Sequence, residues 1–469
     1  MTRALPRPSL LALALLALPA AASAAVPMEG HHAEGDNWPA WRGPERNGIA
    51  PAGGAPTSWG EKENVRWRVE LPGLGISTPI VWGDRLYVTT AVETDRLPEG
   101  ASEAPQAEPE AEPERGRRRG RGRGRGRGAS SPRKVHEFQV LCVDRKDGSV
   151  VWSTTVAETA PHEGIHGTNS QASASPITDG EHIWAFFGSR GLHCLDMKGE
   201  VVWSKEFGRM KTRNEFGEGA SPAIHGDKIV VLWDHEGVDF ITALNKETGE
   251  ELWRTERDEV TTWVTPLIVP VGDQVQVIAS ATDASRAYDL ETGKEIWSIG
   301  GMTTNCIPTP IHHEGVVYLM SGFRGSALQA IRLEGAKGDL KESENLLWSY
   351  GKNTPYVPSG VLVDGKLYFL RVNSGRLTCL DAASGEEHFS AESLGGIRSV
   401  YASLTASGDH VYAASREGET VVFKIGEAYE QVASNVLDDA FDASPVIVDG
   451  ELYLRGRKAL YCIAATPTK

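Results

Sequence analysis

Cysteines are few in this sequence of 469 residues, and none of them forms a recognisable motif. The five are isolated from one another, and no two form a Cys-x-x-Cys pair; they are Cys142, Cys194, Cys306, Cys379 and Cys462. This pattern excludes a small disulfide-stapled domain and a zinc ribbon. We predict that all five are free thiols, buried as small residues between structural repeats.

Positive charge and long apolar stretches are also scarce. The chain has 48 Lys+Arg against 63 Asp+Glu, a net charge of −15, which argues against a nucleic-acid-binding protein. After the first 24 residues no stretch approaches the ~20 apolar residues of a membrane span. The sequence contains no Gly-x-Ser-x-Gly, Walker, His-Glu-x-x-His or calcium-loop motif, so hydrolase and nucleotide-binding functions have no support.

The N-terminus has the pattern of an export signal. In residues 1–24, Arg3 and Arg7 precede an apolar run that ends in Ala22-Ser23-Ala24. No cysteine follows this site, so we predict a soluble monomer that is periplasmic or extracellular and carries no lipid anchor. Residues 25–63 form a predicted N-terminal extension.

A repeat organises the rest of the chain. The 51 Gly and 26 Pro favour turns over long helices. Eight repeats each open with a serine or threonine, which is usually followed by proline. From the second repeat onward they follow one another at intervals of 41 to 50 residues. The openings are Thr78-Pro79, Ser175-Pro176, Ser221-Pro222, Thr265-Pro266, Thr309-Pro310, Ser359-Gly360, Ser403-Leu404 and Ser444-Pro445. Each repeat holds four short apolar runs. The spacing predicts an all-β fold, an eight-bladed β-propeller of four-stranded blades over residues 64–469.

Most repeats close on an aromatic residue, usually tryptophan. In five of them a turn glycine stands four residues before it; the pairs are Gly148/Trp152, Gly199/Trp203, Gly249/Trp253, Gly293/Trp297 and Gly385/Phe389. Trp348 closes the fifth repeat without this glycine, and the seventh has Val432 in place of the aromatic. The eighth repeat supplies only three strands. We therefore predict that residues 64–69 complete the last blade and close the ring, with Trp67 in the position of Trp203 or Trp253.

These motifs resemble those of the pyrroloquinoline-quinone-like repeat propellers. Residues 287–297, AYDLETGKEIW, look like that family's tryptophan-docking motif, and the resemblance covers about residues 64–465. It implies that neighbouring blades are docked by tryptophans; here these are Trp67, Trp152, Trp203, Trp253, Trp297 and Trp348. The phrase at residues 37–44, NWPAWRGP, is similar to the start of exported bacterial proteins of this group.

The resemblance implies two kinds of function. Quinone-dependent dehydrogenases hold pyrroloquinoline quinone between a tryptophan and two adjacent cysteines, beside Ca²⁺. This chain has no adjacent cysteines and no haem-attachment motif. The propeller subunit of the outer-membrane β-barrel assembly machinery is instead a lipoprotein scaffold without catalytic activity. This chain lacks the lipid-attachment cysteine but shares the repeat and the export signal.

A ligand site is expected at one axial end of the ring. In each blade the loops from the fourth strand to the next blade and from the second to the third strand emerge at the same end. Their polar residues predict an anionic or sugar-like ligand. The candidates are Asn169, Arg190, Asn214, Glu218, Asp234, His235, Asn305, Arg324, Tyr356, Arg398 and Asp442. His162 and His166 are closely spaced in one such loop, but no metal site or catalytic residue is predicted.

An insert at 93–134 interrupts the first blade. Its first half is acidic, and Arg115–Gly128 alternates arginine and glycine, so we predict that it is disordered. The sequence thus favours a non-enzymatic exported propeller that binds a cell-envelope protein or glycan at its axial mouth. A quinone-dependent oxidoreductase, with pyrroloquinoline quinone and calcium, is the alternative. A second alternative is polyanion binding through the Arg-Gly tract.

Overall fold

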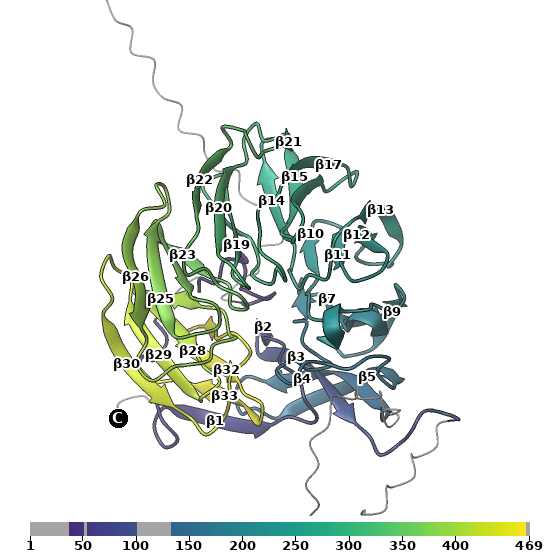
Figure 1. Ribbon diagram of the computed structural model, residues 1–469. Coiled ribbons are helices and arrows are strands. Elements are labelled where there is room, and N and C mark those ends of the chain that lie inside the picture. The colour runs from purple at the N-terminus through teal and green to yellow at the C-terminus, as the bar shows by residue number, and fades with distance from the viewer. Residues whose placement is uncertain (1–36, 51–53, 101–132, 466–469) are drawn as a thin grey trace, which may run out of the picture.

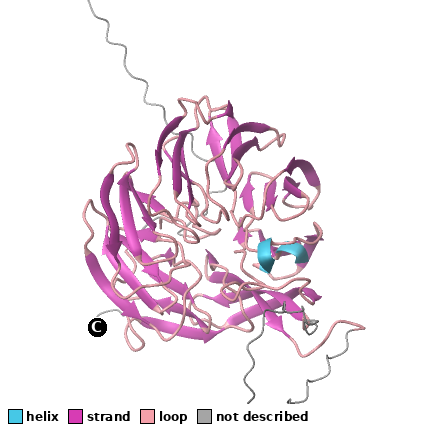
Figure 2. Cartoon of the chain, viewed as in Figure 1, coloured by secondary structure: helices cyan, strands magenta, loops and turns pink. Residues whose placement is uncertain are grey.

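Eight antiparallel sheets form a ring around a central axis (Figure 1). The computed structural model describes residues 37–50, 54–100 and 133–465. Within them the helices are two short 3₁₀ turns, η1 (Gly188–Arg190) and η2 (Arg213–Glu215), and the rest is strand and loop (Figure 2). The predicted all-β propeller is therefore confirmed. The predicted signal peptide, and residues 101–132 of the predicted insert, lie outside the described residues.

The blades follow one another along the chain, and in the first seven the four main strands are ordered as in the sequence, whereas the last blade is completed by β1. The strands of the first four blades are β2 (Ile80–Trp82), β3 (Arg85–Glu93), β4 (His136–Asp144), β5 (Val150–Thr159); β6 (Ile177–Thr178), β7 (His182–Phe186), β8 (Leu192–Asp196), β9 (Val201–Lys205); β10 (Ala223–His225), β11 (Lys228–Trp233), β12 (Asp239–Asn245), β13 (Glu251–Arg257); and β14 (Leu267–Val271), β15 (Gln274–Ala279), β16 (Ser285–Asp289), β17 (Glu295–Ile299). Those of the last four are β18 (Ile311–His313), β19 (Val316–Ser321), β20 (Ala327–Arg332), β22 (Leu346–Tyr350); β23 (Val361–Val363), β24 (Lys366–Leu370), β25 (Arg376–Asp381), β26 (Glu387–Ser393); β27 (Thr405–Ser407), β28 (His410–Ala414), β29 (Glu419–Lys424), β30 (Gln431–Val436); and β31 (Val446–Val448), β32 (Glu451–Arg455), β33 (Ala459–Ile463), β1 (Val65–Glu70).

Burial explains why the middle strands are apolar runs and the outermost strands alternate. All six residues of β11 are buried, because neighbouring blades cover both of its faces. In β13, the outermost strand of the same blade, buried or half-buried residues alternate with exposed ones. The repeat could therefore be recognised from hydrophobicity alone.

The N-terminal strand closes the ring. β1 pairs antiparallel with β33, with Trp67 opposite Cys462 and Glu70 opposite Ala459. In Figure 1 this purple strand lies along the yellow C-terminal blade. The predicted closure is confirmed, so the last blade is built from both ends of the described chain.

Five tryptophans join neighbouring blades. In five interfaces the indole Nε1 donates to a carbonyl in the turn between the third and fourth strands of the next blade. These pairs are Trp67 to Arg145 (2.8 Å), Trp152 to Met197 (3.3 Å), Trp203 to Lys246 (3.1 Å), Trp253 to Leu290 (2.8 Å) and Trp348 to Ala382 (3.2 Å). The ring lies over the turn glycine of that blade, which adopts a positive φ; these are Gly148, Gly199, Gly249, Gly293 and Gly385. The constant glycine spacing therefore marks the docking surface of each blade.

A glycine substitution can separate backbone strain from docking. Gly148 and Gly315 both have φ +77, but a Cβ on Gly148 would lie 2.7 Å from the Trp67 ring, whereas one on Gly315 would meet nothing within 4 Å. Gly315→Ala should cost about 1–2 kcal/mol of unfolding free energy from the left-handed backbone alone. Gly148→Ala should cost a further ~1–3 kcal/mol because Trp67 must move. Urea denaturation of both variants measures the difference, and equal losses would show that the glycine does not serve docking.

Trp297 lacks a glycine to dock against and is covered in another way. The fifth repeat has no turn glycine, and its loop instead forms β21 (Gly338–Asp339), a short fifth strand parallel to β17. The Trp297 side chain is fully buried, and its Nε1 donates to Gln276 Oε1 (3.0 Å) of the same blade. The irregular repeat thus keeps the tryptophan buried without the usual turn.

The seventh blade takes its missing aromatic from the N-terminal segment. In other blades a tyrosine of the second strand packs against the docking aromatic, as Tyr453 does with Trp67 at 6.0 Å between ring centroids. In the seventh blade Trp59 stacks on Tyr412 at 6.5 Å, and its backbone N–H donates to Asn435 Oδ1 (2.9 Å). The prediction that Val432 stands in the aromatic position is wrong by one residue: the register places Ala433 there, opposite Val422, and Val432 is 39% exposed. Part of the predicted extension is therefore packed into the propeller.

Candidate functional site

Residues 37–50 lie against several blades around the axis. Trp38 forms a bridge with Val81 of the first blade, and Ile49 forms one with Ala406 of the seventh. The buried Arg42 guanidinium donates to the carbonyl oxygens of Asn47 and Gly360, and burial lowers the pKa of Arg42 to about 9. This segment links blades that are distant in sequence.

A cavity of about 390 Å³ lies where the loops of all eight blades converge. Six of its lining residues are aromatic: Trp41, Phe216, Trp263, Phe323, Tyr356 and Tyr401. Phe323 comes from a loop between second and third strands, and four of the others come from loops that enter the next blade. Trp41 also lines a pocket of about 10 Å³ beside the proline openings, so it borders both spaces. The volume falls within the range of ~300–1,000 Å³ that is typical of small-molecule sites.

A ring of hydroxyl groups surrounds the axis. The Ser/Thr residue that opens each repeat contacts its counterpart in the next blade, and in seven of the eight contacts a backbone N–H donates to the neighbouring hydroxyl oxygen. These bonds run from Thr78 to Ser175, Ser175 to Ser221, Ser221 to Thr265, Thr309 to Ser359, Ser359 to Ser403, Ser403 to Ser444 and Ser444 to Thr78, at 2.9–3.1 Å. In the eighth, Thr309 Oγ1 donates to the Thr265 carbonyl (2.6 Å). The repeat opening seen in sequence is thus a hydrogen-bonded belt, and six of its members line the cavity.

Three of the sequence candidates line this axial cavity: Asn169, Tyr356 and Asp442. Asn169 Nδ2 donates to the Phe216 carbonyl (2.9 Å). The Tyr356 ring stacks on Phe323 at 4.7 Å, and its hydroxyl accepts from the Nδ2 of buried Asn305 (3.3 Å). Asp442 is paired with two arginines, Arg416 (2.8 Å) and Arg457 (2.7 Å). The cavity therefore presents mainly aromatic and hydroxyl groups.

Another four candidates lie together beside the axis, around the loops of the second and third blades. Arg190, Glu218 and Asp234 line a narrower pocket of about 30 Å³, and His235 follows Asp234. The Asp234 carboxylate is held by Arg257 Nε (2.7 Å) and by the Thr262 hydroxyl (2.8 Å). His235 accepts from the backbone N–H of Lys211 (3.2 Å). These polar groups already have partners within the protein.

Of the remaining four candidates, Asn305 is buried beside Tyr356, and Asn214, Arg324 and Arg398 are exposed. Arg324 lies over the Phe323 ring at 5.2 Å, which brings its charge near the aromatic lining of the cavity. The single polar ring expected from sequence is thus divided into a cavity group, a buried group and an exposed group. Sequence reasoning missed Trp41, Phe216 and Phe323, whose only signal was an aromatic residue between turn-forming residues.

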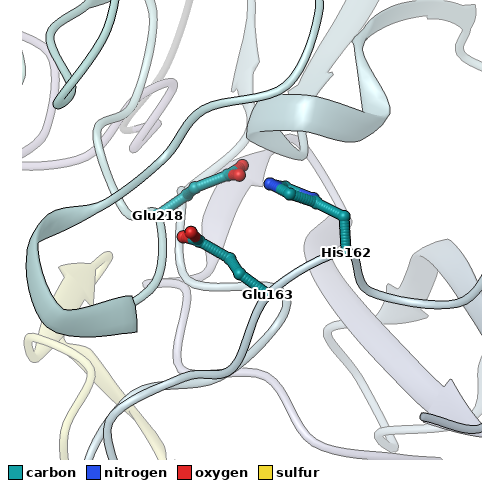
Figure 3. A group of neighbouring side chains, drawn as sticks. All are labelled: His162, Glu163 and Glu218. Carbon is teal, nitrogen blue, oxygen red and sulfur yellow. The ribbon is translucent and has the colours of Figure 1, made fainter. Parts of the chain in front are cut away.

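His162, Glu163 and Glu218 form the one cluster of potential metal ligands among the described residues (Figure 3). Their ligand atoms lie within 4.8 Å of one another. Each is occupied, however: His162 Nε2 contacts the Met210 carbonyl (2.6 Å), Glu163 accepts from the Thr212 N–H (3.1 Å), and Glu218 accepts from the Ser189 N–H (2.6 Å).

A neighbouring arginine indicates that this cluster has a structural role and does not bind a metal. An Arg190 Nη atom lies 3.2 Å from His162 Nδ1, so a guanidinium already supplies the positive charge. Burial raises the pKa of Glu218. His166 lies apart from the cluster, lines the axial cavity and packs edge-on against Phe216 at 5.3 Å. The two histidines that are close in sequence therefore do not share a site.

All five cysteines are free and buried, as predicted. Burial raises the pKa of each of the five thiols to about 12. Thiols with such a pKa stay protonated at neutral pH, which removes the nucleophilic form. They serve packing between blades.

Comparison with known proteins identifies the family to which this fold belongs. The family described as outer membrane protein assembly factor BamB matches residues 136–263 and 237–466. A BamB of Francisella salina is 23% identical over 172 residues, which cover 34% of this chain and only 30% of that relative. No helix within the described ranges is both long and apolar enough to cross a membrane.

Solved structures show the same fold at low identity. The crystal structure of BamB from Moraxella catarrhalis is 13% identical, with a TM-score of 0.50 over 70% of this chain and 93% of that one. A europium-containing methanol dehydrogenase is 10% identical, with a TM-score of 0.59 over 89% of each chain. Similarity at this level establishes the shared propeller and leaves the chemistry to the site itself.

Proposed function

The chain belongs to the outer membrane protein assembly factor BamB family, and from that premise we propose that it is a non-catalytic binding propeller of the cell envelope. Its axial cavity would hold part of a partner molecule. The observation that carries this proposal is the cavity of about 390 Å³, which opens among the converging loops and is lined by six aromatic residues. A concave aromatic surface with a few polar groups is the usual form of a binding site.

The donor set of the cavity supports binding over quinone chemistry. Pyrroloquinoline quinone carries three carboxylates, and its Ca²⁺ requires free carboxylate or amide oxygens. Among the residues that line the cavity, Asp442 is the only carboxylate, and it is paired with Arg416 and Arg457. The lining contains no lysine or arginine. These residues do not fit the quinone and its calcium ion.

The predicted export signal supports a location outside the cytoplasm. We propose a periplasmic or extracellular monomer. The similarity to BamB supports a partner within the cell envelope.

Photo-crosslinking tests this function. A benzophenone amino acid at Tyr356, which lines the cavity, should capture an envelope partner in living cells. The same group at Tyr350, on β22 at the outside of the same blade, is the matched control and should not. Equal capture at both positions, or at neither, would contradict an axial binding site.

A thermal-shift titration with pyrroloquinoline quinone and CaCl₂ tests the absence of catalysis. We expect no shift in the melting temperature and no reduction of an electron-accepting dye with an alcohol or sugar as substrate. A quinone-dependent shift of several degrees with dye reduction would make the protein an oxidoreductase.

A further inference from the structure

The walls and base of the axial cavity carry two kinds of groups that one ligand chemistry would satisfy together. Resting on the proposed binding function, we infer that the cavity takes the terminal, uncharged pyranose unit of a glycan. The aromatic side chains would stack on its C–H faces, and the hydroxyl belt would bind its oxygens.

The hydroxyl belt argues for a ligand rich in hydrogen-bond acceptors. Thr78, Ser175, Ser221, Thr265, Ser403 and Ser444 line the cavity, and the oxygen of each accepts a backbone N–H from a neighbouring blade. Within the described part of the chain, none of these six hydroxyls donates its own proton in a hydrogen bond. A serine or threonine hydroxyl can donate one proton as well as accept. The belt can therefore donate several hydrogen bonds to a ligand on the axis.

The aromatic walls argue for a ligand that also has apolar faces. Tyr356 stacks on Phe323, and Phe216 packs against Trp263 at 6.4 Å, so the rings form two rigid surfaces around the cavity. The face of an aromatic ring is negative and attracts the weakly positive hydrogens of C–H groups. A pyranose presents C–H groups on its faces and oxygens around its rim, which matches walls and base together.

A peptide side chain fits this surface less well. An aromatic or aliphatic side chain would stack on the walls, but it brings no acceptor to the belt. Displacing water from hydroxyl donors without replacing its hydrogen bonds loses affinity. The oxygens of a sugar can take the place of that water.

The residues that line the cavity favour an uncharged unit. Among the lining residues Asp442 is the only carboxylate, and its charge is balanced by Arg416 and Arg457, of which Arg457 donates a hydrogen bond to it. The lining offers no lysine or arginine to pair with a carboxylate or phosphate. A neutral sugar has no charge that would have to be desolvated here.

The N-terminal segment restricts how the ligand enters. Trp41 lines both this cavity and the 10 Å³ pocket beside it, and its segment bridges the first and seventh blades at Trp38 and Ile49. We expect this segment to hinder the passage of a polymer along the axis. The unit that the cavity holds would then be the end of a glycan chain or a free small sugar.

Isothermal titration of the full exported chain tests this inference. The probes are glucose, galactose, mannose and N-acetylglucosamine, together with a trisaccharide of each. We expect millimolar or tighter binding of at least one trisaccharide, weakened tenfold or more by Tyr356→Ala and by Phe323→Ala. Ser403→Ala, which removes one belt hydroxyl, should weaken it as well.

Tyr350→Ala is the matched control, since Tyr350 lies on the outer strand β22 and outside the cavity. It should leave sugar affinity unchanged, and each variant should melt within a few degrees of the parent before its affinity is compared. Affinity that Tyr356→Ala and Phe323→Ala leave unchanged would overturn the inference, as would binding of none of the sugars.

An aromatic-rich extended peptide is the competing probe. Peptide binding that is lost in Tyr356→Ala, with no sugar bound, would overturn the sugar assignment and leave the proposed binding function standing. If crosslinking at Tyr356 also captured no envelope partner, the proposed function would fail together with this inference.

Discussion

Replacing Trp67 by alanine is expected to lower the free energy of unfolding by about 3–5 kcal/mol, the usual cost of removing a buried tryptophan. Trp67 is 8% exposed, packs against Tyr453 and covers Gly148 of the first blade. Its indole N–H also donates to the Arg145 carbonyl (2.8 Å). This side chain therefore contributes to the contact between the C-terminal blade and the first blade, beside the ion pairs of Arg145 with Asp449 and Glu451.

Two further variants show which contacts of Trp67 account for the loss of stability in Trp67→Ala. Trp67→Phe keeps a ring over Gly148 and loses only the indole hydrogen bond and some contact, so it should cost about 1–2 kcal/mol. Trp203→Ala removes the equivalent contact at an interface inside the chain, over Gly249. Only Trp67→Ala should speed hydrogen exchange throughout β1. A Trp67→Ala variant with the stability of the parent would show that closure does not depend on this residue.

The blade architecture could be predicted because each repeat carries its own local signal. The turn glycine and the docking tryptophan recur in sequence because every blade presents the same surface to the next. The contribution of the N-terminal segment could not be predicted in this way. Trp59 takes the place of an aromatic in the seventh blade by stacking on Tyr412, and Trp41 lines the axial cavity together with residues as distant in sequence as Asp442. No periodic pattern records such a contact.

The candidate site was only partly predictable for a related reason. Loop order along the chain brings Asn169, Tyr356 and Asp442 to one cavity. It does not show which polar groups are already taken by other side chains. Arg190 lies against His162, and Asp234 is held by Arg257, so their charges contribute to packing between blades. The aromatic residues that remain around the axis define the site instead.

Loss of the buried Asp234–Arg257 ion pair is expected to lower the free energy of unfolding by a similarly large amount. Both side chains are fully buried, with Nε–Oδ1 and Nη2–Oδ2 distances of 2.7 and 3.1 Å. Arg257→Met should lower the free energy of unfolding by about 3–5 kcal/mol, because it leaves a buried carboxylate without its counter-charge. Asp234→Leu in the same chain should restore part of this loss by removing that carboxylate. The recovery stays incomplete because the Thr262 and Tyr288 hydroxyls then lose their partners.

Urea denaturation of the single and double variants measures this coupling, with Arg96→Met as the control. Arg96 and Glu158 form an ion pair on the surface, with side chains 51% and 49% exposed, so its loss should change stability by less than ~1 kcal/mol. The Arg257→Met variant should also keep the affinity of the axial cavity, since neither partner lines it. If Arg257→Met were as stable as the parent, the carboxylate would not depend on arginine for its charge balance. Asp234 would then again be a candidate for binding a ligand.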